Sequence, residues 1–261
     1  MSRLAPRKTA KDLIDKFSIQ NPSEIFLEEM AYKLGALVID DELEGAEARI
    51  VRRDSSAIIR ISTRIKEIGQ RRFAIGHELG HFIFHIEQNS KACTGKDMIN
   101  WTKDDDIETE ANIFSAELLM PQKFFEPKCD VIEIDFHIIE NLAKEFQTSL
   151  TATAVRFVKF CPEQCALVCS ENGKVRWFRV RKQNFPFLIT PGMKLDENSL
   201  ASNYFEGKEI PDESQYVHSY AWIDSPNAPE EILEHSKPLT SYGCVLSLLW
   251  IPVNEKEERF G

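Results

Sequence analysis

The chain has 261 residues and a formal net charge of −10. It is long enough for one large domain or two smaller ones that each bury a core. Its composition, 43% hydrophobic and 28% charged, is that of an ordinary globular protein. The acidic balance argues against extensive binding to nucleic acid or to an anionic membrane, because both need a basic surface.

The first eight residues are basic, but no apolar run follows them, so the sequence predicts no signal peptide. The longest apolar stretch, 244–253, is too short to span a bilayer and is expected to be a buried strand. We therefore expect a cytoplasmic protein with no membrane segment. Its cysteines are then expected to be reduced thiols, and the spacing within 161–169 matches no common zinc knuckle.

In chain order, the first elements are a helix and three short strands. Segment 22–34 has an apolar stripe with helical spacing and is followed by Gly35, which is typical of a helix end. The strands are expected over 36–39, 48–53 and 57–62. They predict a small antiparallel sheet ahead of the helix that carries a metal motif.

Helices dominate the middle of the chain and strands dominate its end. Helices are expected over 70–85, 105–119, 136–146 and 150–159. Strands are expected over 166–170, 175–180, 216–222 and 244–251. The sequence thus predicts an α+β fold with two domains, residues 1–162 and a smaller mixed α/β domain over 163–261.

The pentapeptide 77–81, His-Glu-Leu-Gly-His, has the spacing of a metal site. Residues four apart lie on one face of a helix, so the imidazoles of His77 and His81 can bind one ion. Glu78 lies at the edge of that face, where its carboxylate can deprotonate a metal-bound water. Zinc lowers the pKa of such a water to about 7. Two structural histidines would give the same spacing, so a third ligand decides between the interpretations.

Two nearby side chains do not qualify as the third ligand. His85 lies eight residues after His77, about 12 Å along a helix axis, so it is expected to pack nearby or to contact a ligand. Glu87 occupies the place of the third ligand in the extended metzincin motif. That motif needs a glycine at position 84, where this chain has Phe84.

The next helix offers an acidic ligand. Glu108 lies 27 residues after His81, which leaves room for a loop and a return helix. It shares a face with Asn112 and with small residues that allow the two helices to pack closely. Asn112 is then placed to orient a ligand imidazole through a hydrogen bond. Glu110 lies on a side better suited to core or surface, so Glu108 is favoured and Glu110 is the alternative.

These motifs together resemble the ImmA/IrrE family of metallo-endopeptidases. The resemblance covers about residues 10–160 and rests on segments 31–35, 71–85 and 108–121. It implies a gluzincin-like zinc peptidase domain, with Zn²⁺ ligands at the positions of His77, His81 and Glu108 and the general base at Glu78. In related proteins the C-terminal domain varies and is sometimes sensor-like, so a regulatory role is expected for 163–261.

The family also implies a class of partner. Its members cleave or inactivate helix-turn-helix repressors in mobile-element control, stress responses and toxin–antitoxin pairs, and many carry their own N-terminal helix-turn-helix domain. The segment ahead of the peptidase-like part is too short for such a domain here. We therefore expect a separately encoded repressor or toxin as the partner.

Two other functions compete with proteolysis. A non-proteolytic antitoxin or anti-repressor could use the zinc fold as a protein-binding module, but such a purely structural site would not need Glu78. Residues 138–158 also have the outline of a helix-turn-helix. Its second helix offers only Arg156 and Lys159 as basic groups, so direct DNA binding is not expected and these helices are expected to buttress the peptidase domain.

Overall fold

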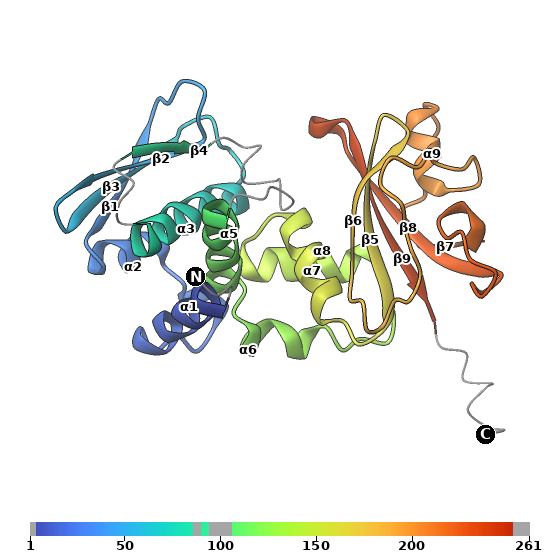
Figure 1. Ribbon diagram of the computed structural model, residues 1–261, viewed down its shortest axis with the longest axis horizontal. Helices are drawn as coiled ribbons and strands as arrows, with labels where there is room; N and C mark the ends of the chain where they lie inside the picture. Colours follow the sequence, from blue (N-terminus) through green and yellow to red (C-terminus); the bar gives the residue numbers. More distant parts are fainter. Residues whose placement is uncertain (1–3, 86–89, 94–105, 253–261) are drawn as a thin grey trace. The chain divides into compact units, whose positions relative to one another are not determined.

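The computed structural model describes residues 4–85, 90–93 and 106–252 as helices, two sheets and their connections (Figure 1). This confirms the prediction of a mixed helical and sheet fold. By their internal contacts the residues divide into two compact units, Met1–Phe125 with Leu142–Ala152, and Glu126–Asn141 with Thr153–Gly261. The predicted domain boundary after residue 162 stays a prediction.

The sheet of the first unit has the strand order β1-β3-β2-β4. Its strands are β1 (Ala36–Asp41), β2 (Ala48–Arg53), β3 (Ser56–Ser62) and β4 (Ser90–Cys93). The strands β2 and β3 form an antiparallel hairpin, with Arg53 opposite Ser56 and Asp54 at a φ of 56° in the turn. Asp54 is a residue type that tolerates this left-handed conformation.

The prediction that this sheet is antiparallel is wrong for one pair, because β1 and β3 run parallel. The loop 42–47 places β2 two strand positions away from β1, and β3 then fills the position between them. Two strand spacings amount to about 10 Å, and six residues can span about 20 Å. A short loop therefore suffices for a crossing that local strand patterns do not encode.

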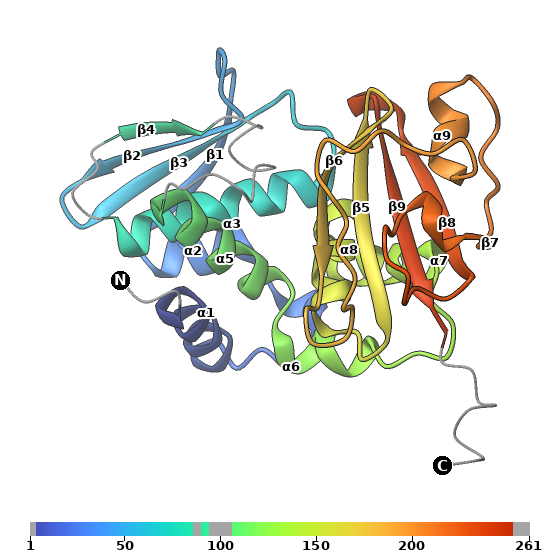
Figure 2. The same ribbon diagram turned by 45° about the vertical axis from the view of Figure 1, so that its right-hand side comes forward.

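The helix α3 (Ile68–Phe84) lies against this sheet (Figure 2). Alternate residues of β2 and β3 are buried, including Ile50, Ile59 and Ile61. They share one core with Ile75 and Leu79 of the helix. This burial fixes which face of α3 meets the sheet and leaves another face for α5.

Further described helices of the first unit include α1 (Leu4–Lys16), α2 (Leu27–Lys33), α5 (Asp106–Leu119) and α6 (Gln122–Phe125). The helix expected over 22–34 is interrupted. A 3₁₀ turn at Pro22–Glu24 ends at Ile25, whose ψ of 81° is not helical, and α2 begins two residues later. Phe26, which lies between the 3₁₀ turn and α2, is consequently 59% exposed.

The second unit contains an antiparallel sheet with the order β6-β5-β9-β8-β7. Its strands are β5 (Gln164–Glu171), β6 (Lys174–Val180), β7 (Gln215–His218), β8 (Glu231–Leu239) and β9 (Cys244–Ile251). Asn172 and Gly173 both have positive φ in the β5–β6 turn, as a two-residue type I′ turn requires. The strand β8 and the helix α9 (Leu200–Phe205) were not predicted.

The helices α7 (Phe136–Phe146) and α8 (Leu150–Phe160) match the expected ranges closely. Arg156, a basic group of the possible helix-turn-helix, is 5% exposed and lies over the ring of Phe160 at 4.8 Å. Its guanidinium therefore packs inside the protein. Within the described side chains, five cysteines are free and buried, in agreement with the prediction of reduced thiols.

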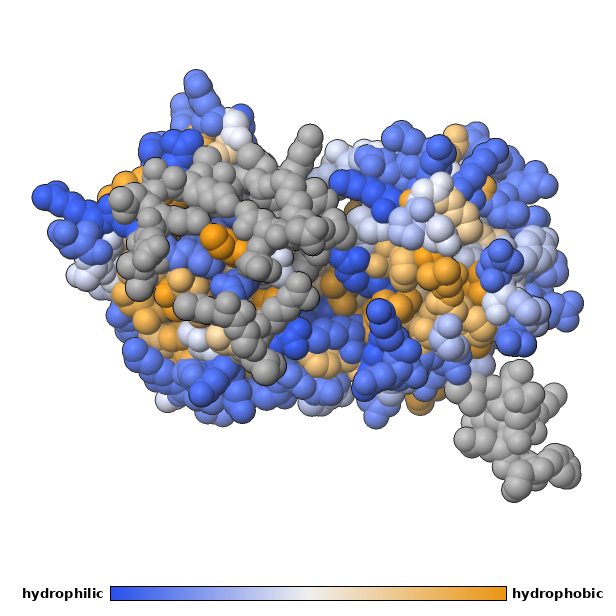
Figure 3. Space-filling model, in the orientation of Figure 1, coloured by the Kyte–Doolittle hydropathy of each residue, from blue (hydrophilic) through white to orange (hydrophobic). Residues whose placement is uncertain are grey.

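Among the described residues, none of the helices is long and apolar enough to cross a membrane. Hydrophilic residues cover much of the face drawn in Figure 3.

Candidate metal centre

The helices α3 and α5 approach closely because small residues line their contact. A Cβ atom added to Gly76 would lie 2.6 Å from the Oγ of Ser115. One added to Gly80 would lie 3.1 Å from the Cα of Ala111, within the range where neighbouring atoms must move apart. The hydroxyl of Ser115 donates to the carbonyl of Phe73 over 3.0 Å and fastens the pair further. Side chains on the facing turns can therefore meet at one point.

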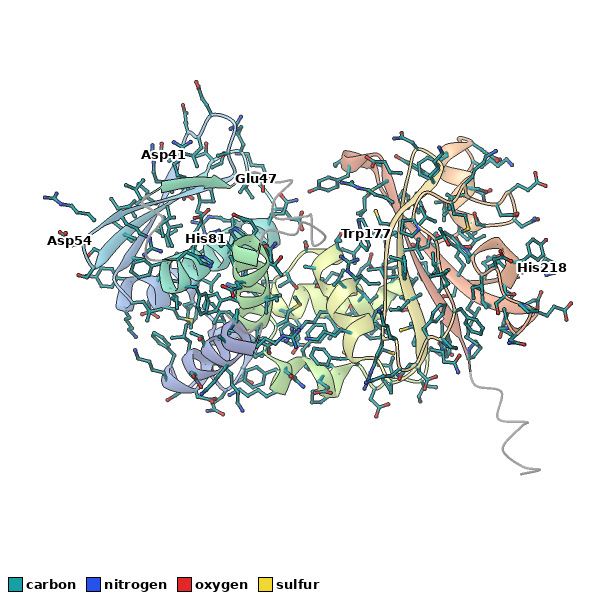
Figure 4. All side chains as sticks on the ribbon, viewed as in Figure 1. Asp41, Glu47, Asp54, His81, Trp177 and His218 are labelled. Atoms are coloured by element: carbon teal, nitrogen blue, oxygen red, sulfur yellow. The ribbon has the colours of Figure 1, made fainter. Side chains whose placement is uncertain are left out.

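Three donor atoms meet between these helices. The Nε2 atoms of His77 and His81 lie 3.0 Å apart. The Oε2 atom of Glu108 lies 3.1 Å from the first and 3.6 Å from the second. All three residues are buried, and Figure 4 shows His81 on α3 beside α5.

These distances fit a tetrahedral zinc site. Zinc–nitrogen and zinc–oxygen bonds of about 2.0–2.2 Å place neighbouring ligand atoms about 3.3 Å apart, and the three distances between the donor atoms, 3.0, 3.1 and 3.6 Å, lie around that value. Two imidazoles and one carboxylate are also the donor set of a zinc site that keeps a fourth position for water. The residues present therefore fit a zinc ion.

Hydrogen bonding sets the orientation of the first imidazole. The Nδ1 of His77 lies 2.9 Å from the Oδ1 of Asn112, and both side chains are buried. The amide oxygen only accepts, so Nδ1 carries the proton and the lone pair of Nε2 points toward the other two donors. Asn112 thus occupies the orienting position that its spacing from Glu108 predicts.

Glu78 is fully buried on α3, directly after His77. Of the two acids on α5 considered as third ligand, the structure brings Glu108 to the imidazoles. Glu110 instead lies 3.2 Å from the Nε2 of His85, which the sequence reasoning did not predict. Glu87 lies outside the described residues.

Comparison with known proteins identifies the family of the segment that contains these residues. Residues 31–158, about half of the chain, match the model of the IrrE N-terminal-like domain, peptidase family M78. This segment belongs to that family. The family consists of metallopeptidases, and the match confirms the resemblance to ImmA/IrrE proteins. No curated protein sequence matches the chain.

The fold is also found among solved structures. A transcriptional regulator of Mycobacterium tuberculosis is similar over 95% of this chain and 88% of its own length, with a TM-score of 0.58 and 14% sequence identity. At this identity the likeness shows a common fold. It extends beyond the IrrE-like segment to the part of the chain that follows it.

Burial of His81 makes the stability of the metal-free protein depend on pH. It lowers the pKa of His81 from 6.5 to about 4, so the imidazole is neutral at pH 7. Because the folded-state pKa is the lower one, the unfolded chain binds the proton first as the pH falls. The contribution of His81 to the free energy of unfolding is therefore fully present above about pH 6.5 and is lost as the pH falls to about 4. At 1.36 kcal/mol per pH unit, the loss amounts to about 3 kcal/mol.

Urea unfolding of the metal-free protein between about pH 7 and pH 4.5 measures this loss. His81→Gln is expected to show a shallower decline, because the neutral amide does not titrate. Equal slopes for both proteins would contradict the assignment to His81.

A second group of ligand-type side chains lies where the start of α7 meets β8 and consists of Asp135, His137 and His235. The backbone N–H of Phe136 donates to the Nδ1 of His235 over 3.1 Å, and that of Ile138 donates to the Oδ1 of Asp135 over 3.0 Å. These bonds satisfy N–H groups that the first turn of a helix leaves without partners. Helix capping therefore accounts for Asp135 and His235, while the Nδ1 of His137 lies 3.2 Å from the Oδ2 of Asp135.

Proposed function

We propose that the chain is a zinc-dependent endopeptidase of the gluzincin type, which hydrolyses a peptide bond in a protein partner. One observation carries the proposal: His77, His81 and Glu108 bring three buried donor atoms within 3.6 Å of one another. Glu78, which directly follows His77 in the chain, is a buried acid. The membership in a peptidase family supports the same conclusion.

Each residue has a defined part in this reaction. When bound, zinc supplies a Lewis acid that polarises the scissile carbonyl and lowers the pKa of water. The imidazoles of His77 and His81 and the carboxylate of Glu108 would hold the ion. Glu78 would take the proton of the attacking water as general base and then pass it to the leaving amine. Asn112 would keep the ring of His77 in the orientation that binding requires.

We further propose that the substrate is a separately encoded helix-turn-helix repressor. The ImmA/IrrE resemblance supports this class of partner, and so does the similar fold of a protein described as a transcriptional regulator. Such repressors act on chromosomal DNA, so the proposed site of action is the cytoplasm. Segment 163–261 would regulate the reaction.

Metal analysis combined with co-incubation tests the proposal. The purified chain is expected to carry about one zinc per molecule and to cut the repressor-like protein encoded beside it into two fragments, read by intact mass. A chelator should stop the cleavage and added zinc should restore it. A zinc-free chain that leaves the partner whole while binding it would instead favour the antitoxin or anti-repressor function.

A further inference from the structure

The second imidazole of the site is held by a chain of two further side chains. The Nδ1 of His81 lies 2.9 Å from the Nδ1 of His85, one helical turn further along α3. The Nε2 of His85 lies 3.2 Å from the Oε2 of Glu110 on α5. The side chains of His85 and Glu110 are only 8% and 10% exposed, so bulk water does not compete strongly for these contacts.

The hydrogen-bonding capacities fix where every proton of this chain lies. If the Nε2 of His81 faces a metal with its lone pair, its Nδ1 must carry the proton and donate to the Nδ1 of His85. A neutral His85 that accepts at Nδ1 carries its own proton on Nε2. That proton is then donated to the carboxylate of Glu110, which only accepts. Each contact in the series Glu110–His85–His81 therefore pairs one donor with one acceptor.

The two ligand imidazoles are therefore supported differently. His77 donates to the neutral amide of Asn112, whereas His81 is connected through His85 to a charged carboxylate. A carboxylate at the far end raises the basicity of a ligand imidazole and fixes its ring, and loss of such partners typically weakens metal binding by 10–100-fold. The support is also anchored on both helices, because His85 ends α3 and Glu110 lies on α5.

We propose that His85 and Glu110 are positioning residues that hold His81 ready for the metal. The inference rests on the proposed zinc site, since it concerns the affinity of that site. It assigns a function to Glu110, the acid that is not a ligand. It also explains why His85 follows His81 by one helical turn, although it lies too far away to bind the ion itself.

Zinc affinity measured on the full chain tests the proposal. Metal-free wild type, Glu110→Gln, His85→Ala and the double variant are titrated with zinc against a chromophoric chelator. Each single variant is expected to bind zinc 10–100-fold more weakly. The double variant should bind zinc with the same affinity as the single variant that binds it less tightly, because both residues act through the same hydrogen bonds.

A matched control separates positioning from a general effect on folding. Glu117→Gln makes the same exchange at a buried acid of α5, whose Oε1 accepts the N–H of Gln122, and should keep the wild-type zinc affinity. In the Co²⁺-loaded protein, the visible absorption should change in Glu110→Gln and stay constant in Glu117→Gln. Urea unfolding of each metal-free variant reports any loss of fold separately.

The outcomes distinguish the two proposals. If wild type binds zinc and folded Glu110→Gln and His85→Ala bind it within twofold of wild type, the positioning role is wrong and the zinc site stands. If wild type itself binds no zinc, the proposed function fails and the positioning role fails with it. Additive losses in the double variant would show that the two residues do not act as one chain.

Discussion

Replacing Glu78 with glutamine is expected to abolish peptide-bond hydrolysis while zinc remains bound. Glutamine has nearly the same shape as glutamate, so the exchange leaves no cavity at this fully buried position. It removes the only function proposed for the side chain, which is to accept and return a proton. General acid–base catalysis contributes about 10²–10⁴-fold to a rate, so cleavage should fall by at least about a hundredfold.

The measurement is the initial rate of partner cleavage by intact mass, with the zinc content of each preparation determined in parallel. Glu117→Gln provides the control, since it changes another buried acid outside the proposed site and should cleave at the wild-type rate. A Glu78→Gln protein that inactivates its partner as well as wild type would disprove the peptidase mechanism. Inactivation without fragments would then identify sequestration as the function.

The candidate site could be predicted largely because its information is local. The spacing of His77 and His81 sets their common face on any helix, and Asn112 follows Glu108 by one turn. The choice between Glu108 and Glu110 depends on the rotation of α5 against α3. Gly76 and Gly80 fix that rotation by admitting Ser115 and Ala111, a contact between distant parts of the chain.

Other features depend on contacts that no local pattern encodes. The parallel pairing of β1 with β3 follows from where the hairpin returns in the sheet, and each strand alone looks the same in either direction. The strand β8 was missed because Glu234, His235 and Ser236 read as polar although all three are buried. The carboxylate of Glu234 accepts the N–H groups of Leu200 and Ala201, a pairing 33–34 residues apart. Its polarity is satisfied only in the folded protein.

The close approach of α3 and α5 predicts that Gly80→Leu will disrupt the proposed zinc site without changing any of the proposed ligands. The first added atom would already lie 3.1 Å from the Cα of Ala111 and 3.2 Å from the Cδ1 of Phe114, and leucine adds three further carbon atoms beyond it. The helices must move apart, and Glu108, three residues before Ala111, moves with α5. A displacement of 1 Å is half of a zinc–oxygen bond. We therefore expect zinc affinity to fall by at least about a hundredfold.

The unfolding free energy of the Gly80 variants separates overpacking from helix propensity, because the two effects change it in opposite directions. Leucine and alanine both favour a helix over glycine by up to about 1 kcal/mol, so propensity alone would stabilise either variant. Overpacking costs about 1–3 kcal/mol, so Gly80→Leu should lower the unfolding free energy of the metal-free protein. Gly80→Ala, whose single methyl needs a shift of a few tenths of an ångström, should fall between wild type and Gly80→Leu in zinc affinity. If Gly80→Leu is as stable as wild type and binds zinc equally well, the helices are not in close contact at this glycine, and the approach of Glu108 to the two imidazoles needs another cause.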